Sequence, residues 1–295
     1  MPPLVRYANE FQDSERWHEF PFREGDIVIS TRSKSGTTWV QMICALLVFG
    51  SAELPEPLPT LSPWLDMRIA PKNDVYTRLA AQQYRRFIKT HTPLDGVPAD
   101  PRVTYIVVGR HPLDMAVSMY HHTKNLDMDR IRSLSGQQES AGPAEPMPSL
   151  HDWVLHWVDR DVPAVEDLDA LPGVLWHISD AWARRNQQPN VLLVHYADLL
   201  MDLEGEMRRL AQALEIDVPE KAWSALVEAA TFNSMKAQAD RLAPNAGDVL
   251  KDSVAFFHRG TSDTGRQVLT ADELAHYEEK VRLLVPSDVW KWLHR

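Results

Sequence analysis

The chain has 295 residues, of which 44% are hydrophobic and 8% aromatic, so it can build a sizeable core and is too apolar to be disordered. Its formal net charge of −10 argues against nucleic-acid binding and against a basic membrane-binding face, but leaves room for a locally basic site that binds an anion. The single cysteine, Cys44, excludes a disulfide framework and is compatible with a reducing cytoplasm, where we expect the protein. We expect no stable membrane insertion, because the apolar run 40–50 is too short to span a bilayer.

Four β-rich runs alternate with helical segments along much of the chain. Three of the runs are dense in Val, Ile and Leu without clean alternation, which is typical of parallel strands covered on both faces. The predicted strands are 26–31, 87–91, 103–109 and 191–196, and the predicted helices are 38–49, 113–123, 174–185 and 203–214. This order predicts a doubly wound α/β domain, which binds ligands in the loops at the carboxyl ends of its strands.

Two segments are predicted to be loops because they are rich in residues that break regular structure. Residues 54–63 contain four prolines, and residues 133–148 are rich in Ser, Gly, Gln and Pro. The second segment is too polar to pack, so we expect a mobile surface loop or lid around 127–149, inside a single domain of residues 1–295. The part of the chain from 220 is predicted to be mostly helical, with an interruption at 245–265.

The segment Lys34-Ser35-Gly36-Thr37-Thr38-Trp39 joins the first predicted strand to a helix. It provides a lysine, a glycine that allows close backbone approach, and hydroxyl groups at the start of the helix. Because the first N–H groups of a helix have no internal partner, the segment is suited to hold an anion. It is not a Walker A loop, in which the lysine follows the last glycine. The alternative is an ordinary capped turn with an exposed lysine.

His91 follows the second predicted strand, in the run Phe87-Ile88-Lys89-Thr90-His91-Thr92-Pro93. With an ordinary pKa near 6.5, a histidine at such a strand end is suited to take a proton from a hydroxyl group at neutral pH. Its alternative role is structural, as for most single histidines.

Arg110 follows the third predicted strand, and Pro112 begins the next helix, which carries Ser118. An arginine directly after a buried strand is well placed to make a forked contact with phosphate, although it could equally be a surface charge. The histidines His111, His121 and His122 show no metal-ligand spacing, and we expect them to be solvated groups on and after a helix.

Several of these segments resemble motifs of the cytosolic sulfotransferase family, and they occur in the family's order. Lys34–Trp39 resembles its 5′-phosphosulfate loop, although the family has Tyr-Pro where this chain has Arg32-Ser33. Lys89–His91 resembles its Lys-Thr-His segment, and Arg110–Ser118 its 3′-phosphate motif. The resemblance implies a P-loop-like α/β domain with a central parallel sheet of about five strands and helices on both faces. It also implies 3′-phosphoadenosine-5′-phosphosulfate (PAPS) as the donor, with no metal.

The resemblance implies a role for each matching residue. His91 is the general base, Lys89 helps to bind the transferring group, and Lys34 stabilises the bridging oxygen as the sulfuryl group leaves. Further donor contacts are implied for the remaining loop residues Ser35, Gly36, Thr37, Thr38 and Trp39, for Arg110 and Ser118, for Tyr196, for Thr231 and Phe232, and for His258, Arg259 and Gly260. His258 stands where the family has arginine, so we expect donor affinity to strengthen as pH falls through the pKa of His258.

The resemblance also implies that Pro63 and Trp64, together with Lys89 and His91, bind the acceptor. This combination most resembles actinobacterial glycolipid sulfotransferases, which favours a glycolipid or another lipophilic alcohol or phenol as the acceptor. Two alternatives are open: a P-loop kinase, which needs a lysine after Gly36, and a non-catalytic nucleotide-binding protein of the same fold. The oligomeric state is left open.

Overall fold

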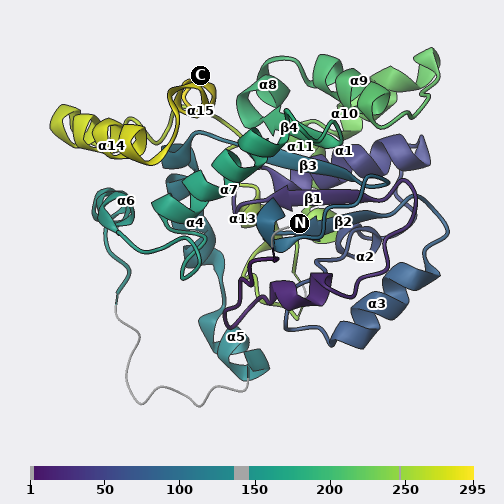
Figure 1. Cartoon of the computed structure of the whole chain (residues 1–295), viewed down its shortest axis with the longest axis horizontal. Helices are drawn as coiled ribbons and strands as arrows, with labels where there is room; N and C mark the ends of the chain where they lie inside the picture. The colour runs from purple at the N-terminus through teal and green to yellow at the C-terminus, as the bar shows by residue number, and fades with distance from the viewer. Residues whose placement is uncertain (1–2, 136–145, 246) are drawn as a thin grey trace.

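The computed structural model describes residues 3–135, 146–245 and 247–295, in which a parallel sheet lies between two layers of helices (Figure 1). The strands are β1 (Ile27–Thr31), β2 (Phe87–Thr90), β3 (Thr104–Gly109) and β4 (Val191–His195), in the order β2-β1-β3-β4. Each strand lies within about one residue of its predicted run. The sheet has four strands in the described residues, where the family resemblance implied about five.

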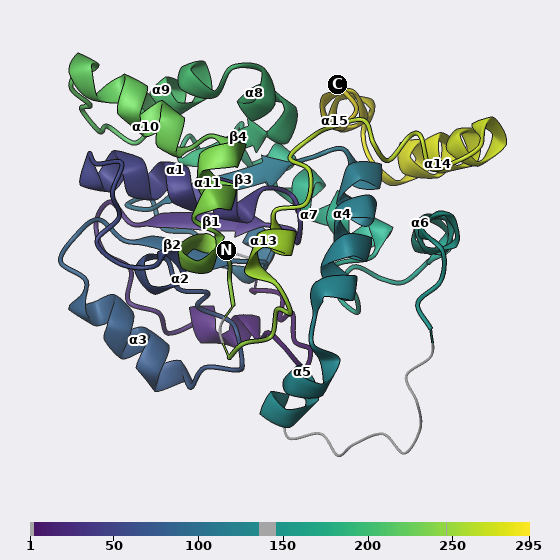
Figure 2. The same cartoon turned by 180° about the vertical axis from the view of Figure 1, so that it is seen from behind.

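Both faces of the sheet are covered, which explains why its strands show no alternation. All five residues of β1 are buried, with Ile27 and Ile29 in one core cluster and Val28 in the other. Figure 2 shows α1 and α11 in front of the sheet on the first of these faces. The helices of this face are α1 (Thr37–Phe49), α2 (Leu58–Leu61), α8 (Tyr196–Met201), α9 (Leu203–Ala213), η3 (Glu220–Ala222), α10 (Trp223–Ala229), α11 (Phe232–Ala237), α12 (Ala239–Leu242) and α13 (Ser253–Phe256).

The opposite face carries the second core cluster and includes α7, which crosses the strands in Figure 1. Its helices are η1 (Ser14–Trp17), α3 (Lys72–Ala81), η2 (Leu94–Gly96), α4 (Pro112–Asn125), α6 (Leu150–Asp159), α7 (Leu171–Arg184), α14 (Ala271–Leu284) and α15 (Ser287–Leu293). The remaining helix of the described residues, α5 (Met128–Ser135), ends directly before the segment 136–145. No helix in the described parts of the chain is long and apolar enough to cross a membrane.

The two predicted loops are only partly loops. Residues 54–63 contain the short helix α2, and residues 133–135 belong to α5, so the predicted lid around 127–149 begins as a helix. The central part of that prediction, residues 136–145, lies outside the described residues. The interruption predicted at 245–265 contains the single turn α13.

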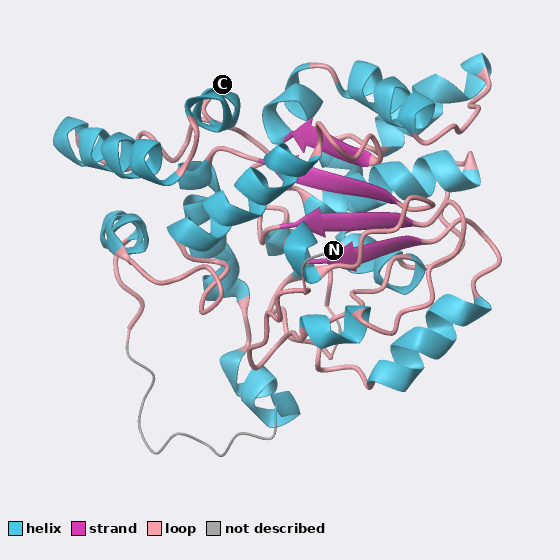
Figure 3. Cartoon of the chain, viewed as in Figure 1, coloured by secondary structure: helices cyan, strands magenta, loops and turns pink. Residues whose placement is uncertain are grey.

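All four strands are parallel, so their carboxyl ends meet at one edge of the sheet (Figure 3). The residues that directly follow β1, β2, β3 and β4 are Arg32, His91, Arg110 and Tyr196. Three of these four are predicted site residues, and the fourth is the arginine that departs from the family pattern. The fold therefore brings the predicted motifs to the edge at which open α/β sheets bind their ligands.

Candidate active site

The loop after β1 turns sharply before α1 begins. Lys34 has φ 64° and Gly36 has φ 111°, in the left-handed region that favours glycine. A Cβ atom at Gly36 would lie 2.9 Å from Cδ2 of Tyr196, so this position requires a glycine for space as well as for conformation. The loop thereby brings its backbone against the start of α1, where free N–H groups can bind an anion.

Two hydroxyl groups of this loop stabilise its own shape. The Ser35 hydroxyl donates to the carbonyl of Arg32 at 2.7 Å, and the Thr37 and Thr31 hydroxyls lie 2.6 Å apart. Thr38 is buried in the first turn of α1. The geometry of the loop is therefore set by internal hydrogen bonds before any ligand arrives.

Three cations lie beside this loop: the amines of Lys34 and Lys89 and the guanidinium of Arg110. Burial, followed by the charges of Arg110 and Lys89, lowers the pKa of Lys34 to about 7. Burial lowers the pKa of Lys89 to about 8. Each amine also lies over an aromatic ring: Lys34 Nζ is 4.0 Å from the ring centroid of Phe256, and Lys89 Nζ is 4.4 Å from that of Trp64. Cations crowded in this way are stabilised by a polyanion that binds between them.

His91 is buried, and its protonation state follows from its neighbours. Its Nδ1 lies 2.5 Å from the carbonyl oxygen of Thr31. A carbonyl only accepts hydrogen bonds, so Nδ1 carries the proton and the lone pair is on Nε2. Burial, then the charges of Lys89 and Arg32, holds the pKa of His91 well below its usual value. The ring is therefore neutral at pH 7, which is the form that a general base requires.

The segment 63–66 supports the strand that precedes His91, and the role of its last residue, Asp66, was not predicted from the sequence. The carbonyl of Pro63 accepts from the amide of Lys89 at 3.1 Å, which adds a short extension to the edge of β2. Asp66, which is fully buried, accepts from the hydroxyls of Thr90 at 2.6 Å and Thr92 at 2.5 Å, on either side of His91. Burial raises the pKa of Asp66. A carboxylate directly after the mostly apolar run 61–65 was the signal available for this residue.

Trp64, a predicted acceptor-side residue, packs directly against His91. The two ring centroids are 4.6 Å apart with the planes at 78°. The same indole covers the amine of Lys89. An apolar wall therefore borders both the predicted base and the lysine next to it.

Arg110 is turned toward the backbone of two loops. It donates from Nη1 to the carbonyl of Lys34 at 2.9 Å and from Nη2 to that of Thr261 at 3.0 Å. Its guanidinium lies 4.2 Å from the ring centroid of Tyr196, and within the described residues its Nε has no partner. Ser118 is half-buried on α4. A phosphate could therefore contact Arg110 only through the N–H groups that do not already donate to these two carbonyls.

The segment 258–260 lies over α4 and α11. The ring of His258 stacks on that of His121, with centroids 3.8 Å apart and planes at 20°. Burial, His121 and Arg259 lower the pKa of His258 to about 4. The prediction that His111, His121 and His122 are solvated was wrong for His111, which is 5% exposed and caps α4, and right only in part for the other two, which are half-buried. The sequence does not show that His258 covers His121. Gly260 has φ 64°, and its Cβ would lie 2.3 Å from Cδ2 of Phe232.

The predicted adenine-binding residues differ in their accessibility. Trp39 and Tyr196 are only 8% and 7% exposed, and their ring centroids are 5.2 Å apart. The indole N–H of Trp39 donates to the carbonyl of Ala230 at 2.8 Å. Thr231 caps α11, while Phe232 beside it is half-buried and in contact with Phe257. Phe232 therefore offers the more accessible aromatic face.

The sulfotransferase domain family matches residues 24–285 of the chain, which includes every predicted site residue. The chain belongs to this family. It is 39% identical to the glycolipid sulfotransferases of Mycobacterium tuberculosis (strain H37Ra) and Mycobacterium bovis (strain BCG), over its full length and 95% of theirs. Its fold matches the crystal structure of mouse sulfotransferase SULT7A1 complexed with PAP, with a TM-score of 0.68 and 20% identity over 95% of this chain and 91% of that one.

This sulfotransferase also anchors the loop that follows the 258–260 segment. The carboxylate of Asp114, at the start of α4, accepts from the amide of Asp263 at 2.9 Å, the hydroxyl of Thr264 at 3.2 Å and the amide of Gly265 at 2.8 Å. A Cβ at Gly265 would lie 2.4 Å from the carbonyl carbon of Leu113. The loop is thus attached closely to the helix that follows Arg110.

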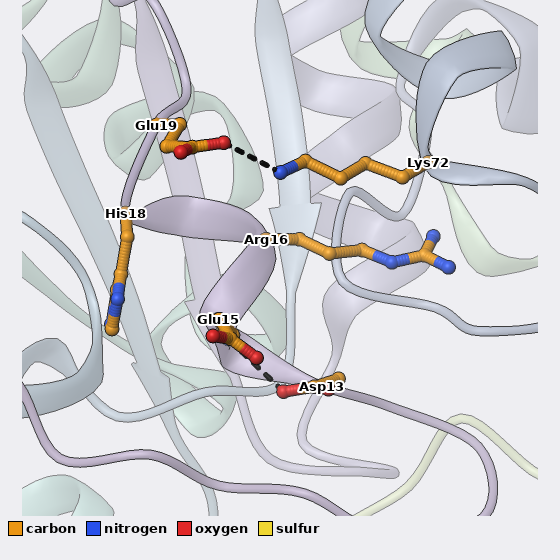
Figure 4. Close-up of a pocket in the computed structure, with 6 residues that line it drawn as sticks. All are labelled: Asp13, Glu15, Arg16, His18, Glu19 and Lys72. Atoms are coloured by element: carbon orange, nitrogen blue, oxygen red, sulfur yellow. Dashed lines mark hydrogen bonds and ion pairs between the residues drawn. The ribbon is translucent and has the colours of Figure 1, made fainter.

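A surface hollow of about 320 Å³ lies at η1, outside the predicted site (Figure 4). Its charged side chains are engaged within the protein. Lys72 reaches Glu19 at 3.0 Å, Asp13 pairs with Arg6 at 2.8 Å, and Arg16 donates to the carbonyl of Ala70 at 2.9 Å. The cations that line the hollow are therefore already paired or hydrogen-bonded within the protein.

Proposed function

We propose that this sulfotransferase takes the sulfuryl group from PAPS and transfers it to a hydroxyl group of a lipophilic acceptor, with a glycolipid as the first class to test. The donor supplies the sulfuryl group and a phosphate that can leave. The protein supplies an anion site, a neutral base and an apolar wall. We further propose that residues 1–295 work as a single domain, since both helical layers share one sheet.

The donor would be held at the start of α1 and beside the three cations. The loop 34–39 would bind the 5′-phosphosulfate end, and Lys34 would stabilise the negative charge that develops on the leaving phosphate oxygen. Arg110, Ser118 and the segment 258–260 would bind the 3′-phosphate. Sulfuryl transfer, like phosphoryl transfer, depends chiefly on such positioning and charge stabilisation.

The observation that carries the proposal is the contact between Nδ1 of His91 and the carbonyl oxygen of Thr31. Because Nδ1 donates to the carbonyl of Thr31, Nε2 is free to take the proton of an acceptor hydroxyl. The acceptor oxygen then forms a bond to sulfur while the bond from sulfur to the bridging phosphate oxygen breaks. Lys89, next but one in sequence, would stabilise the charge on the transferring group.

His91→Ala should lower turnover by ~10²–10⁴, the usual contribution of a general base. Transfer of labelled sulfate from PAPS measures this effect, and binding of adenosine 3′,5′-bisphosphate serves as the control for an intact donor site. Near-wild-type turnover of His91→Ala, with unchanged binding of the bisphosphate, would assign the base to another group.

Two observations support a lipophilic acceptor: Trp64 lies against His91, and the mycobacterial relatives are glycolipid sulfotransferases. A panel of glycolipids, long-chain alcohols and simple phenols tests the class. We expect glycolipids to give the highest kcat/KM, and Trp64→Ala to raise KM for them more than for a small phenol. A preference for the small phenol in both proteins would contradict this choice of acceptor.

A further inference from the structure

Arg32 occupies an unusual position at the carboxyl edge of the sheet. It is the first residue after β1, and although it is an arginine it is only 2% exposed. Its Nη1 donates to the backbone carbonyl of His91, and its Nη2 contacts Oδ1 of Asp169 at 2.6 Å. Burying a guanidinium group is costly unless it is paired and hydrogen-bonded. These contacts satisfy Nη1 and Nη2, whereas Nε is buried with no partner in the described residues.

The residue pair Thr31-Arg32 contacts His91 at two points. The carbonyl of Thr31 accepts from the ring Nδ1, and the guanidinium of Arg32 donates to the carbonyl of the same histidine. The ring and the backbone of His91 are therefore both held by the segment that leads into the donor loop. No other contact described above connects the acceptor-side histidine so directly to that loop.

Asp169 is itself fixed in place, in the loop between α6 and α7. Its amide donates to the side chain of Asp167 at 2.8 Å, and its carbonyl accepts from the indole of Trp157 at 2.7 Å. The side chain of Asp169 is 46% exposed, whereas that of Arg32 is 3% exposed. One member of this ion pair is thus desolvated beside His91, and the other faces solvent.

We propose that Arg32 is a positioning residue, which holds His91 against the donor loop and, together with Asp169, sets the charge that surrounds it. The inference rests on the proposed role of His91 as the general base. It assigns a function to the position where this chain departs from the Tyr-Pro of the family pattern.

The charges around His91 determine what a substitution should do. Lys89 on β2 and Arg32 both lower the pKa of His91, as does His177 on α7. The carboxylate of Asp169 faces Arg32, and that of Asp66 lies on the side of Thr90 and Thr92. Removing the positive charge of Arg32 should therefore raise the pKa of His91, whereas removing its counter-charge at Asp169 should lower it.

The test is the pH profile of kcat/KM for Arg32→Gln and Asp169→Asn, measured with saturating PAPS. The acid limb reports the protonation of the base. We expect it to move to higher pH in Arg32→Gln, by about 0.5–1 unit for one nearby charge, and to lower pH in Asp169→Asn. A purely structural role would lower activity in both variants without moving the limb in opposite directions.

Arg32→Lys separates the charge from the forked geometry. It should keep the acid limb near its wild-type position and lower kcat, because an ammonium group cannot bridge the carbonyl of His91 and Asp169 in the same way. If Arg32→Gln does not fold, Arg32→Lys and Asp169→Asn still decide the question. Acid limbs that stay unshifted in Asp169→Asn, or shift in the same direction in both charge-removing variants, overturn the inference.

A matched control is available at the other end of the strands. Arg86 is also 2% exposed, and its Nε donates to Oδ1 of Asp26 at 2.8 Å, at the amino ends of the strands. Arg86→Gln removes a buried ion pair without touching the site, so it should lower stability and leave the acid limb in place. If His91→Ala keeps its turnover, the proposed base is wrong. If His91→Ala is inactive but the limbs do not shift, only the role of Arg32 is wrong.

Discussion

Replacing Lys34 with arginine should remove most of the pH dependence of donor binding. In the free protein the pKa of Lys34 is about 7, because of burial and then of the charges of Arg110 and Lys89. At pH 8 about nine in ten of these amines are therefore neutral, and a bound phosphate would draw a proton back onto them. Binding of adenosine 3′,5′-bisphosphate at pH 8 should take up about 0.9 proton through Lys34.

The direction and the size of the pH dependence follow from this coupling between proton uptake and ligand binding. The occupied site holds more protons than the empty site, so affinity is highest below pH 7 and falls as pH rises. From pH 7 to pH 9 the dissociation constant should increase ~50-fold through Lys34 alone. If Lys89, whose pKa is about 8, also contacts the ligand, the increase should reach ~500-fold. The phosphates themselves add little, because their second ionisation is complete above about pH 7.

Calorimetry in buffers of different ionisation enthalpy measures the proton uptake directly. Wild type should show it at pH 8 and much less at pH 6, while Lys34→Arg should lose the contribution of about 0.9 proton because arginine stays charged. Equal proton uptake in the two proteins, or a dissociation constant that does not change between pH 7 and pH 9, would refute the assignment of Lys34 to the donor phosphate.

Three further outcomes are expected. Gly109→Ala should lower the free energy of unfolding in urea by about 1–3 kcal/mol, because its Cβ would lie 2.2 Å from Cζ3 of Trp292; a variant as stable as wild type would show that the indole moves aside freely. His111 and His177 have pKa values of about 3 as a result of burial, so stability should fall as pH drops below 6.5, with a loss of about 2 kcal/mol per histidine at pH 5. Denaturant titrations at pH 5 and pH 7 check this slope, and equal stabilities would contradict it. His258→Arg should strengthen binding of adenosine 3′,5′-bisphosphate about tenfold at pH 7.5, since a permanent charge replaces a ring whose pKa is about 4; an unchanged dissociation constant would place the phosphate away from this residue.

The pH dependence first expected for His258 changes in one respect. The resemblance to the family predicted that donor affinity strengthens as pH falls through the pKa of this histidine. Because burial, and then the charges of His121 and Arg259, lower that pKa, the expected strengthening begins in more acidic solution than for an ordinary histidine. In the neutral range, the titration of Lys34 is the stronger effect.

The main elements of the fold were predictable because they depend on local patterns, and the same patterns place the candidate site residues at strand ends. Runs such as 103–109 are buried on both faces, and a turn with glycine at 36 marks the change from strand to helix. Parallel strands bring the residues after them to one edge, so His91 and Arg110 had to lie at the same edge of the sheet once the strands were assigned. The number of strands was less well predicted, because it came from the family resemblance and exceeded the four β-rich runs of this chain.

The contacts that the sequence did not reveal join residues far apart in the chain. Arg32 reaches Asp169, Asp66 reaches Thr90 and Thr92, and His258 covers His121. Local propensity says nothing about such pairs. The position of Arg32 nevertheless carried a signal, since it follows a buried strand just as Arg110 does.

Asp114 has a consequence for the kinetics of the reaction. Its carboxylate attaches the amides of Asp263 and Gly265 to the start of α4, and Arg110, two residues before α4, holds the carbonyl of Thr261. The loop and the helix therefore form one rigid wall of the proposed nucleotide site. Release of a nucleotide past this wall requires these bonds to break together. Under conditions in which every opening leads to exchange, the amides of Asp263 and Gly265 should then exchange with deuterium at one common rate, and this opening rate sets an upper limit on product escape by this route.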